Sequence, residues 1–118
     1  MTDCIFCKIA NGAIPSNKIF EDDDVLVFHD IHPVAPVHFL VVPKVHITSL
    51  AHADEAQQAL LGKLLLVGAR VARELGLADG FRTIVNTGAG GGQTVFHLHV
   101  HVLGGPGLSP RIAEVVTH

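Results

Sequence analysis

The sequence contains no tryptophan and no tyrosine, and it has only two cysteines among its 118 residues. Without indole and phenol rings, a surface on which single-stranded nucleic acid stacks is not expected. Basic side chains are also few: the chain has eight Lys and Arg and eleven Asp and Glu, which gives a net charge of −3. This balance disfavours attraction to a nucleic-acid backbone or an anionic membrane surface. The composition therefore predicts a protein with neither nucleic acid nor a membrane as its partner.

Long apolar runs and an export signal are missing as well. The longest apolar stretches, such as 64–67 and 39–42, fall far short of the ~20 residues of a transmembrane helix. The first residues, MTDCIFCKIANG, lack the basic start and the cleavage site of a signal peptide. We therefore expect a cytoplasmic protein, in which a structural disulfide is unusual. A mass of 12.5 kDa and a hydrophobic fraction of 48% predict one folded domain over residues 1–118.

Apolar periodicity and turn residues predict an α+β domain with a mainly antiparallel sheet, one face of which is covered by a long helix. Asp54 would open that helix and Gly76 would end it. One apolar stripe follows the helix at steps of three and four residues: Leu60, Leu64, Val67, Val71 and Leu75. Asp3 would cap a short N-terminal helix. Strands are expected at 18–21, 25–29, 38–43, 81–86 and 95–103, and the tail after 108 is left unassigned, with room for a short element at 111–116.

Histidine is the residue type that the chain has in excess, with nine copies. Because strand side chains alternate, His97, His99 and His101 would share one face of the last strand, and apolar residues would take the other face. Three interpretations compete: a solvent-facing strand, a metal site, and phosphoryl chemistry with a neutral imidazole as nucleophile. The glycine-rich segment 86–94 directly precedes the strand, and its backbone N–H groups could surround an anion. This juxtaposition favours phosphoryl chemistry.

The second motif is C-x-x-C at Cys4 and Cys7. On a helix these side chains lie one turn apart, so both sulfurs could bind one ion. A pair of free buried cysteines is the simpler alternative. A redox role is less favoured, since no thioredoxin-like βαβ pattern surrounds the motif.

The stretch from His97 to Leu103, which reads H-φ-H-φ-H-φ-φ, resembles the signature of the histidine triad (HIT) superfamily. The resemblance spans residues 1–105 and includes segments such as 28–31, 43–47 and 91–95. Gly104-Gly105 resembles the HINT branch, the histidine triad nucleotide-binding proteins. The resemblance implies a HIT-like fold with five strands, one long helix and a short N-terminal helix. It also implies a homodimer, joined through the long helix and the fourth strand.

The resemblance further implies a purine nucleotide-binding hydrolase that acts at the α-phosphate of nucleoside phosphoramidates, without a catalytic metal. His99 would be the nucleophile and would form a covalent nucleotidyl-histidine intermediate. His101 would contact the phosphate and the leaving group, while His97 and His38 would orient and support the site. Two alternatives stay open: a dinucleoside polyphosphate hydrolase, and a nucleotide-binding or zinc-stabilised interaction protein with vestigial activity.

Further residues receive roles by the same resemblance. The purine would lie among Phe6, Ile9, Ile14, Phe28, Ile31 and Leu40. The ribose would meet His29 and Asp30, and the phosphate would meet Asn86, Gly92, Gln93 and Thr94. A structural zinc ion would be held by Cys4, Cys7, His46 and His97. His32 and the tail after Gly105 depart from the family pattern, which leaves the choice of substrate open.

Overall fold

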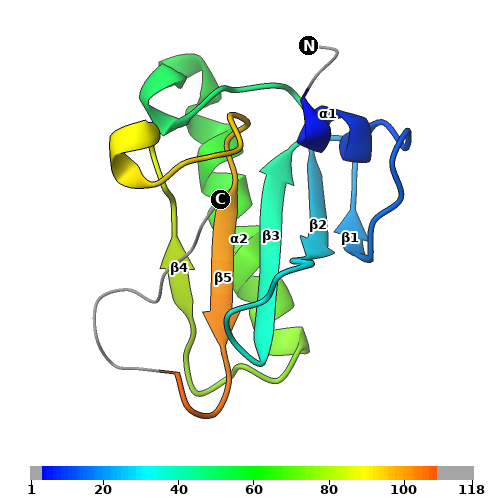
Figure 1. The fold of residues 1–118 in the computed structure, drawn as a ribbon, viewed down its shortest axis with the longest axis vertical. Helices are drawn as coiled ribbons and strands as arrows, with labels where there is room; N and C mark the ends of the chain where they lie inside the picture. The colour runs from blue at the N-terminus through cyan, green and yellow to red at the C-terminus, as the bar shows by residue number, and fades with distance from the viewer. Residues whose placement is uncertain (1–3, 109–118) are drawn as a thin grey trace.

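The fold is given by a computed structural model that describes residues 4–108. Five strands form one sheet, in which every neighbouring pair is antiparallel and the spatial order is β1-β2-β3-β5-β4 (Figure 1). The predicted α+β class is therefore confirmed. The strands are β1 (Lys18–Glu21), β2 (Val25–His29), β3 (Val37–Pro43), β4 (Arg82–Ile84) and β5 (Val100–Gly104).

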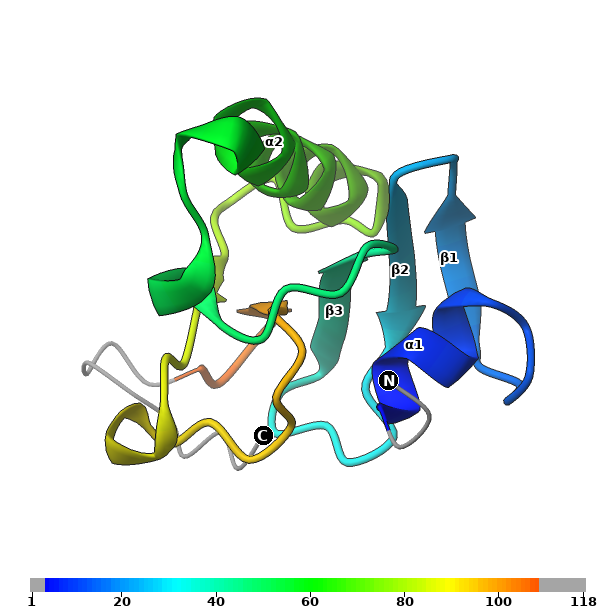
Figure 2. The same ribbon diagram turned by 90° about the horizontal axis from the view of Figure 1, so that it is seen from above.

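The long helix α2 (Gln58–Glu74) covers one face of the sheet, and α1 (Ile5–Ala10) lies on the opposite side (Figure 2). The predicted apolar stripe of α2 faces the core, since Leu64, Val67 and Val71 are buried there. The helix packs closely on the sheet at Gly68, where an added Cβ would lie 3.4 Å from the side chains of both Val41 and Val102. A larger side chain at this position would push α2 away from β3 and β5.

A second, smaller core lies under α1. It consists of Phe6, Ile9, Leu26, Phe28, Leu40 and Val42. Asp3, the predicted cap of α1, lies outside the described residues. Cys4 occupies the N-cap position instead, and its sulfur accepts a hydrogen bond from the backbone N–H of Cys7 at 3.2 Å.

Side-chain alternation along the central strands places different residue types on the two faces of the sheet. On β3, Phe39 and Val41 belong to the large core under α2, whereas Leu40 belongs to the core under α1. His38 alternates with them and therefore points to the α1 face. The α2 face carries the large apolar core, with His29 and Thr83 at its margins because they pair with Phe39 and Val102, and the α1 face mixes apolar side chains with the buried histidines.

The fifth strand is shorter than expected. It begins at Val100 and not at 95, so His97 and His99 precede it. The ladder with β3 stops at the Val41–Val100 pair because Pro43 has no N–H to donate and its carbonyl oxygen accepts from the His97 ring at 2.8 Å. Beyond this point the backbone N–H of Leu98 donates to the carbonyl oxygen of Ile47 at 2.6 Å.

Other boundaries differ slightly from the predicted ones. The fourth strand covers only 82–84, and a short 3₁₀ turn over 55–57 comes between the Asp54 cap and the start of α2. The possible element at 111–116 lies outside the described residues. Among residues 4–108, no helix has the length and apolar character needed to cross a membrane.

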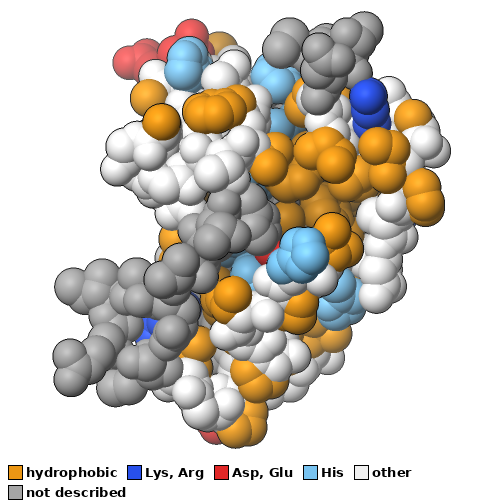
Figure 3. Space-filling view, in the orientation of Figure 1, with side chains coloured by type: hydrophobic (Ala, Val, Ile, Leu, Met, Phe, Trp, Pro, Cys, Tyr) orange, Lys and Arg blue, Asp and Glu red, His pale blue; other side chains and the backbone are white. Residues whose placement is uncertain are grey.

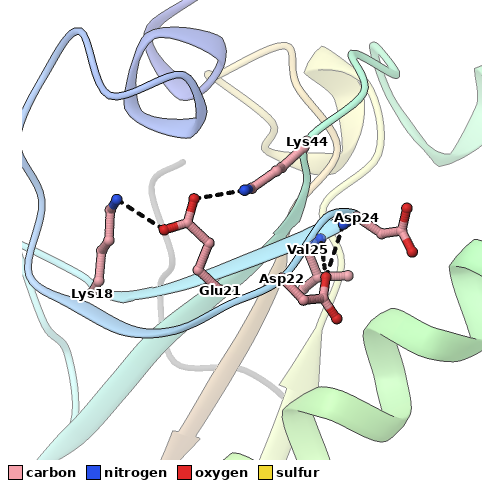
Figure 4. A network of polar contacts seen from close by, with 6 residues as sticks. All are labelled: Lys18, Glu21, Asp22, Asp24, Val25 and Lys44. Atoms are coloured by element: carbon pink, nitrogen blue, oxygen red, sulfur yellow. Dashed lines mark hydrogen bonds and ion pairs between the residues drawn. The ribbon is translucent and has the colours of Figure 1, made fainter.

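A polar network fixes the β1–β2 turn (Figure 4). Asp22 Oδ1 accepts from the backbone N–H groups of Asp24 at 2.8 Å and Val25 at 2.9 Å. Its Oδ2 lies 2.8 Å from the ammonium group of Lys63 on α2. Lys63 and these backbone donors lower the pKa of Asp22 to about 2. The turn is thereby tied to the helix on the far side of the core.

Replacing Asp22 with alanine should lower the free energy of unfolding by about 1–2 kcal/mol, because two turn N–H groups lose their acceptor. Asp22→Asn keeps that acceptor and loses only the charge, so it serves as the control. The carboxylate stabilises the fold above its ordinary pKa, and this contribution disappears as the pH falls toward 2. In urea titrations, the advantage of wild type over Asp22→Asn should therefore shrink between pH 4 and pH 2; an advantage independent of pH would contradict this account.

Candidate functional site

The three histidines of the motif lie together on the α1 face. His97, His99 and His101 are all buried, with at most 1% of any of them exposed. The rings of His99 and His101 have centroids 4.9 Å apart, and Phe6 of α1 packs edge-on against His99 at 5.0 Å. The predicted alternation holds even where the chain is not in the strand, since Leu98 packs into the core under α2.

One hydrogen bond sets the tautomer of His99. Its Nδ1 lies 2.6 Å from the carbonyl oxygen of His97, and a carbonyl can only accept, so Nδ1 carries the proton. In the neutral imidazole the lone pair is then on Nε2. His99 therefore has a nucleophilic nitrogen on the side of the ring away from its own backbone contact.

A chain of hydrogen bonds sets the tautomer of His101 in the opposite sense. The backbone N–H of Val34 donates to His38 Nδ1 at 3.1 Å, so His38 carries its proton on Nε2. That proton faces His101 Nδ1 at 3.0 Å and Asp30 Oδ2 at 3.2 Å. His101 Nδ1 must then accept, which puts the proton of the neutral His101 ring on Nε2.

The same contacts bear on metal binding by Asp30, His38 and His101, whose ligand atoms lie within 4.8 Å of one another. An ion on His38 Nε2 would require the proton to move to Nδ1. The N–H of Val34 already points at Nδ1, so this move would set two donors against each other. The geometry favours a hydrogen-bonded relay at these three residues.

A second cluster brings together the four residues of the predicted zinc site. The ligand atoms of Cys4, Cys7, His46 and His97 all lie within 4.8 Å of one another. His97 Nδ1 is 3.2 Å from the sulfur of Cys4 and 3.4 Å from that of Cys7, and His46 Nδ1 is 3.3 Å from the Cys7 sulfur. Adjacent sulfur and nitrogen ligands of a tetrahedral zinc ion stand about 3.5 Å apart. The four residues therefore fit a tetrahedral Cys₂His₂ site.

The protonation of His97 also suits a metal ligand. Its Nε2–H donates to the carbonyl oxygen of Pro43, so the lone pair of Nδ1 is directed at the two sulfurs. Such a backbone partner on the far nitrogen is typical of metal-bound histidine. Burial is the main cause that lowers the pKa of His97, to about 4, so the ring is neutral near pH 7. Burial, followed by the neighbouring Cys4, raises the pKa of the Cys7 thiol to about 11.

The backbone N–H groups of the glycine-rich loop donate mainly to acceptors within the loop, which its sequence does not suggest. The N–H groups of residues 91 and 93 donate to the carbonyl oxygen of Gly88, and that of Gly92 donates to Ala89. The N–H of Gly88 donates to the side-chain oxygen of Gln93. These four amides therefore do not form the anion nest that the glycine run predicts. Gly92 does lie beside Asn86, because an added Cβ on it would be 3.9 Å from Asn86 Cγ.

Gln93 has a structural role that the sequence does not reveal. The residue is buried, and its side-chain nitrogen donates to the carbonyl oxygens of Thr48 at 2.9 Å and Val95 at 3.0 Å. Its oxygen accepts from Gly88 at 2.8 Å. Gln93 thus clamps the loop to the Thr48 segment, while Thr94, next in the chain, is exposed.

The residues expected around a purine are mostly gathered in one place. Phe6, Ile9, Phe28 and Leu40 are buried in the core under α1, and Ile14 packs against it. On this face, hydrophobic side chains line a hollow with histidines at its margin (Figure 3). Ile31 does not join them, since 84% of its surface is exposed.

The residues expected at the ribose lie at the end of β2. His29 is half-buried and Asp30 is buried. Both carboxylate oxygens of Asp30 have partners inside the protein, because Oδ1 accepts from the N–H of His32 at 2.8 Å and Oδ2 faces His38. A ribose hydroxyl would have to share this carboxylate with them.

Comparison with known proteins is consistent with this geometry. The HIT domain family matches residues 11–107. Protein HitA of Neisseria gonorrhoeae is 54% identical over 106 residues, which cover 90% of this chain and 99% of the relative. A HIT family hydrolase from Legionella pneumophila superposes with a TM-score of 0.89 at 41% identity, over 92% of this chain and 97% of its own. A zinc-bound histidine triad family protein from Mycobacterium smegmatis has a TM-score of 0.78 at 37% identity, over 98% and 86%.

The clamp formed by Gln93 can be tested by Gln93→Glu, which keeps the acceptor for Gly88 and sets carboxylate oxygens against two carbonyl oxygens. The free energy of unfolding should fall by about 2 kcal/mol or more, because two buried acceptors lose their donor. Gln58→Glu makes the same chemical change at an exposed position of α2 and should stay within about 0.5 kcal/mol of wild type. Urea unfolding measures both; equal effects of the two substitutions would refute the clamp.

Proposed function

The chain belongs to the HIT domain family, and on this basis we propose that it is a purine nucleotide hydrolase of the HINT-like branch. The proposed substrates are nucleoside phosphoramidates, in which an amine is joined to the α-phosphate. The observation that carries the proposal is the pair of opposite tautomers at His99 and His101, whose rings are in contact. One ring offers a lone pair and its neighbour offers a proton, as cleavage of a P–N bond requires.

In the proposed reaction, His99 Nε2 attacks phosphorus and forms a nucleotidyl-imidazole. The P–N bond breaks, and the amine takes the Nε2 proton of His101, which reacts as the imidazolium after taking up one proton from solvent and is left as the neutral ring. Asp30, through His38, stabilises the positive charge that His101 carries before this transfer. Water then attacks the nucleotidyl-imidazole, with His101 as the base, and releases the nucleoside monophosphate.

Binding of the purine is assigned to the hollow under α1. Its side chains are aliphatic or phenyl groups, so the contact with the base would be one of shape. Asn86, Gly92 and Thr94 lie on or beside the glycine-rich loop and are proposed to contact the phosphate. Gln93 would act indirectly, since it holds that loop in place.

We further propose that Cys4, Cys7, His46 and His97 hold a structural zinc ion. The ion would supply a tetrahedral cross-link between α1 and the two segments that carry the histidines. Thiolate ligands of this kind are consistent with the proposed cytoplasmic, reducing location.

The protein is proposed to act as a homodimer built on one HIT domain per chain. Leu65 and Leu66 of α2 are exposed, at 52% and 74%, and β4 lies at the edge of the sheet. An exposed apolar pair and an open sheet edge each suit contact with a second copy of the chain. Light scattering should therefore give twice the mass of the chain.

The proposed reaction predicts that wild type hydrolyses adenosine 5′-phosphoramidate and that His99→Ala loses at least about 1,000-fold in kcat/KM, because the nucleophile is gone. His52→Ala changes an exposed histidine outside the site and should retain full activity. Release of AMP from the phosphoramidate and from diadenosine tetraphosphate should be compared, and the phosphoramidate should react faster. Equal rates for wild type and His99→Ala would exclude this mechanism.

The proposed zinc site predicts about one zinc ion per chain in protein purified without chelator. Cys7→Ala removes one of four ligands and should lower the zinc content at least severalfold, along with the melting temperature. His52→Ala again serves as the control and should keep its zinc. Metal analysis by mass spectrometry, with thiol titration, measures both; two freely reacting thiols and a zinc content far below one per chain would rule the site out.

A further inference from the structure

His97 connects the cysteine pair to the proposed nucleophile. Its ring is buried between the two sulfurs on one side and the carbonyl oxygen of Pro43 on the other. Its own carbonyl oxygen accepts the Nδ1 proton of His99 at 2.6 Å. The ring that lies between the sulfurs and the carbonyl that orients His99 belong to the same residue. A shift of the His97 ring therefore changes the hydrogen bond that orients His99.

The segment that carries this hydrogen bond is only lightly held by the sheet. β5 begins at Val100, so no ladder fixes residues 97–99. Leu98 donates instead to Ile47, the residue after His46. The cluster thus holds the same two segments together, because His46 and His97 lie on either side of this backbone bond.

The helix α1 provides a second connection. Phe6 lies between Cys4 and Cys7 in the sequence, and its ring packs against His99 at 5.0 Å, against Phe28 at 5.6 Å and against His97 at 6.0 Å. The helix has only six residues, and the Cys4 sulfur forms its N-cap. Its position against the histidines therefore depends on the two cysteine side chains as well as on the buried Phe6 and Ile9.

From these contacts we infer that the Cys4–Cys7 pair is a thiol switch that controls the orientation of His99, with His97 as the positioning residue. The inference rests on the proposed function in taking His99 as the nucleophile. In the reduced state the pair holds α1 and the His97 ring in place. In the oxidised state both anchors are lost, and His99 no longer presents Nε2 to phosphorus.

The oxidation needs a two-electron oxidant such as hydrogen peroxide. The two thiols lose two electrons and two protons and form one S–S bond, and the O–O bond of the peroxide breaks to give two water molecules. Both cysteines are free and only partly buried, and their sulfurs lie within 4.8 Å, so a local movement of α1 brings them together. His46 and His97 then remain as two ligands, too few to hold a zinc ion. A dithiol reductant reverses the step.

The experiment treats the full chain with hydrogen peroxide and follows four quantities. These are disulfide formation by mass, zinc release by a chromogenic chelator, the ¹⁵N signals of the His99 ring at constant pH, and turnover of adenosine 5′-phosphoramidate. Oxidation should release the zinc, shift or broaden the His99 signals and lower kcat at least tenfold. Reduction with added zinc should restore all three.

Cys4→His is the matched control, since it keeps four possible ligands and removes the disulfide partner; if it does not fold, Cys7→His serves the same purpose. Peroxide should leave the zinc content, the His99 signals and the turnover of this control at the values that the same variant has before oxidation. A complete disulfide with unchanged His99 signals would overturn the coupling, and the absence of a disulfide would overturn the switch. Shifted His99 signals in a protein that turns over no phosphoramidate in any state would support the coupling and count against the proposed function.

Discussion

The 2.6 Å hydrogen bond between the His99 ring and the His97 carbonyl is the contact on which the rest of the site depends. It determines which nitrogen of His99 carries a lone pair. It also makes that choice depend on a residue whose own ring lies in the cysteine cluster. His97 therefore has two functions: its carbonyl orients His99, and its ring belongs to the cluster that could bind a metal. A change in one affects the other.

Burial of so many imidazoles would be costly if they carried charge. Each buried ring has a polar partner on at least one of its nitrogens, which lowers this cost. His97 is the clearest case, since burial holds its pKa near 4 while the Pro43 carbonyl satisfies its N–H. The opposite face of the sheet carries the large apolar core under α2, so the histidine face is free to serve chemistry.

The sequence predicts the parts of this design that follow from periodicity. The apolar stripe of α2 and the alternation of Leu98 with the histidines are both visible in the residue order. The early end of the β5 ladder is not visible, because it depends on the His97 ring, and not a strand N–H, donating to the carbonyl oxygen of Pro43. The glycine run misleads for a related reason: a buried glutamine, Gln93, closes the loop on itself, and nothing in the local sequence shows that its side chain is buried.

The absence of tyrosine and tryptophan affects which groups can fix the tautomers of the buried histidines. With no phenol or indole donor available, main-chain groups fix the tautomers: the carbonyls of Pro43 and His97, and the N–H of Val34. A main-chain donor or acceptor stays in place when its side chain is replaced, so point substitutions that spare His38 leave the tautomers largely intact. The tautomers of His97 and His99 change only when the backbone moves. Residues 97–99 have few ladder hydrogen bonds and are anchored by the cysteine cluster. The tautomers are therefore most sensitive to movement of this segment and of that cluster.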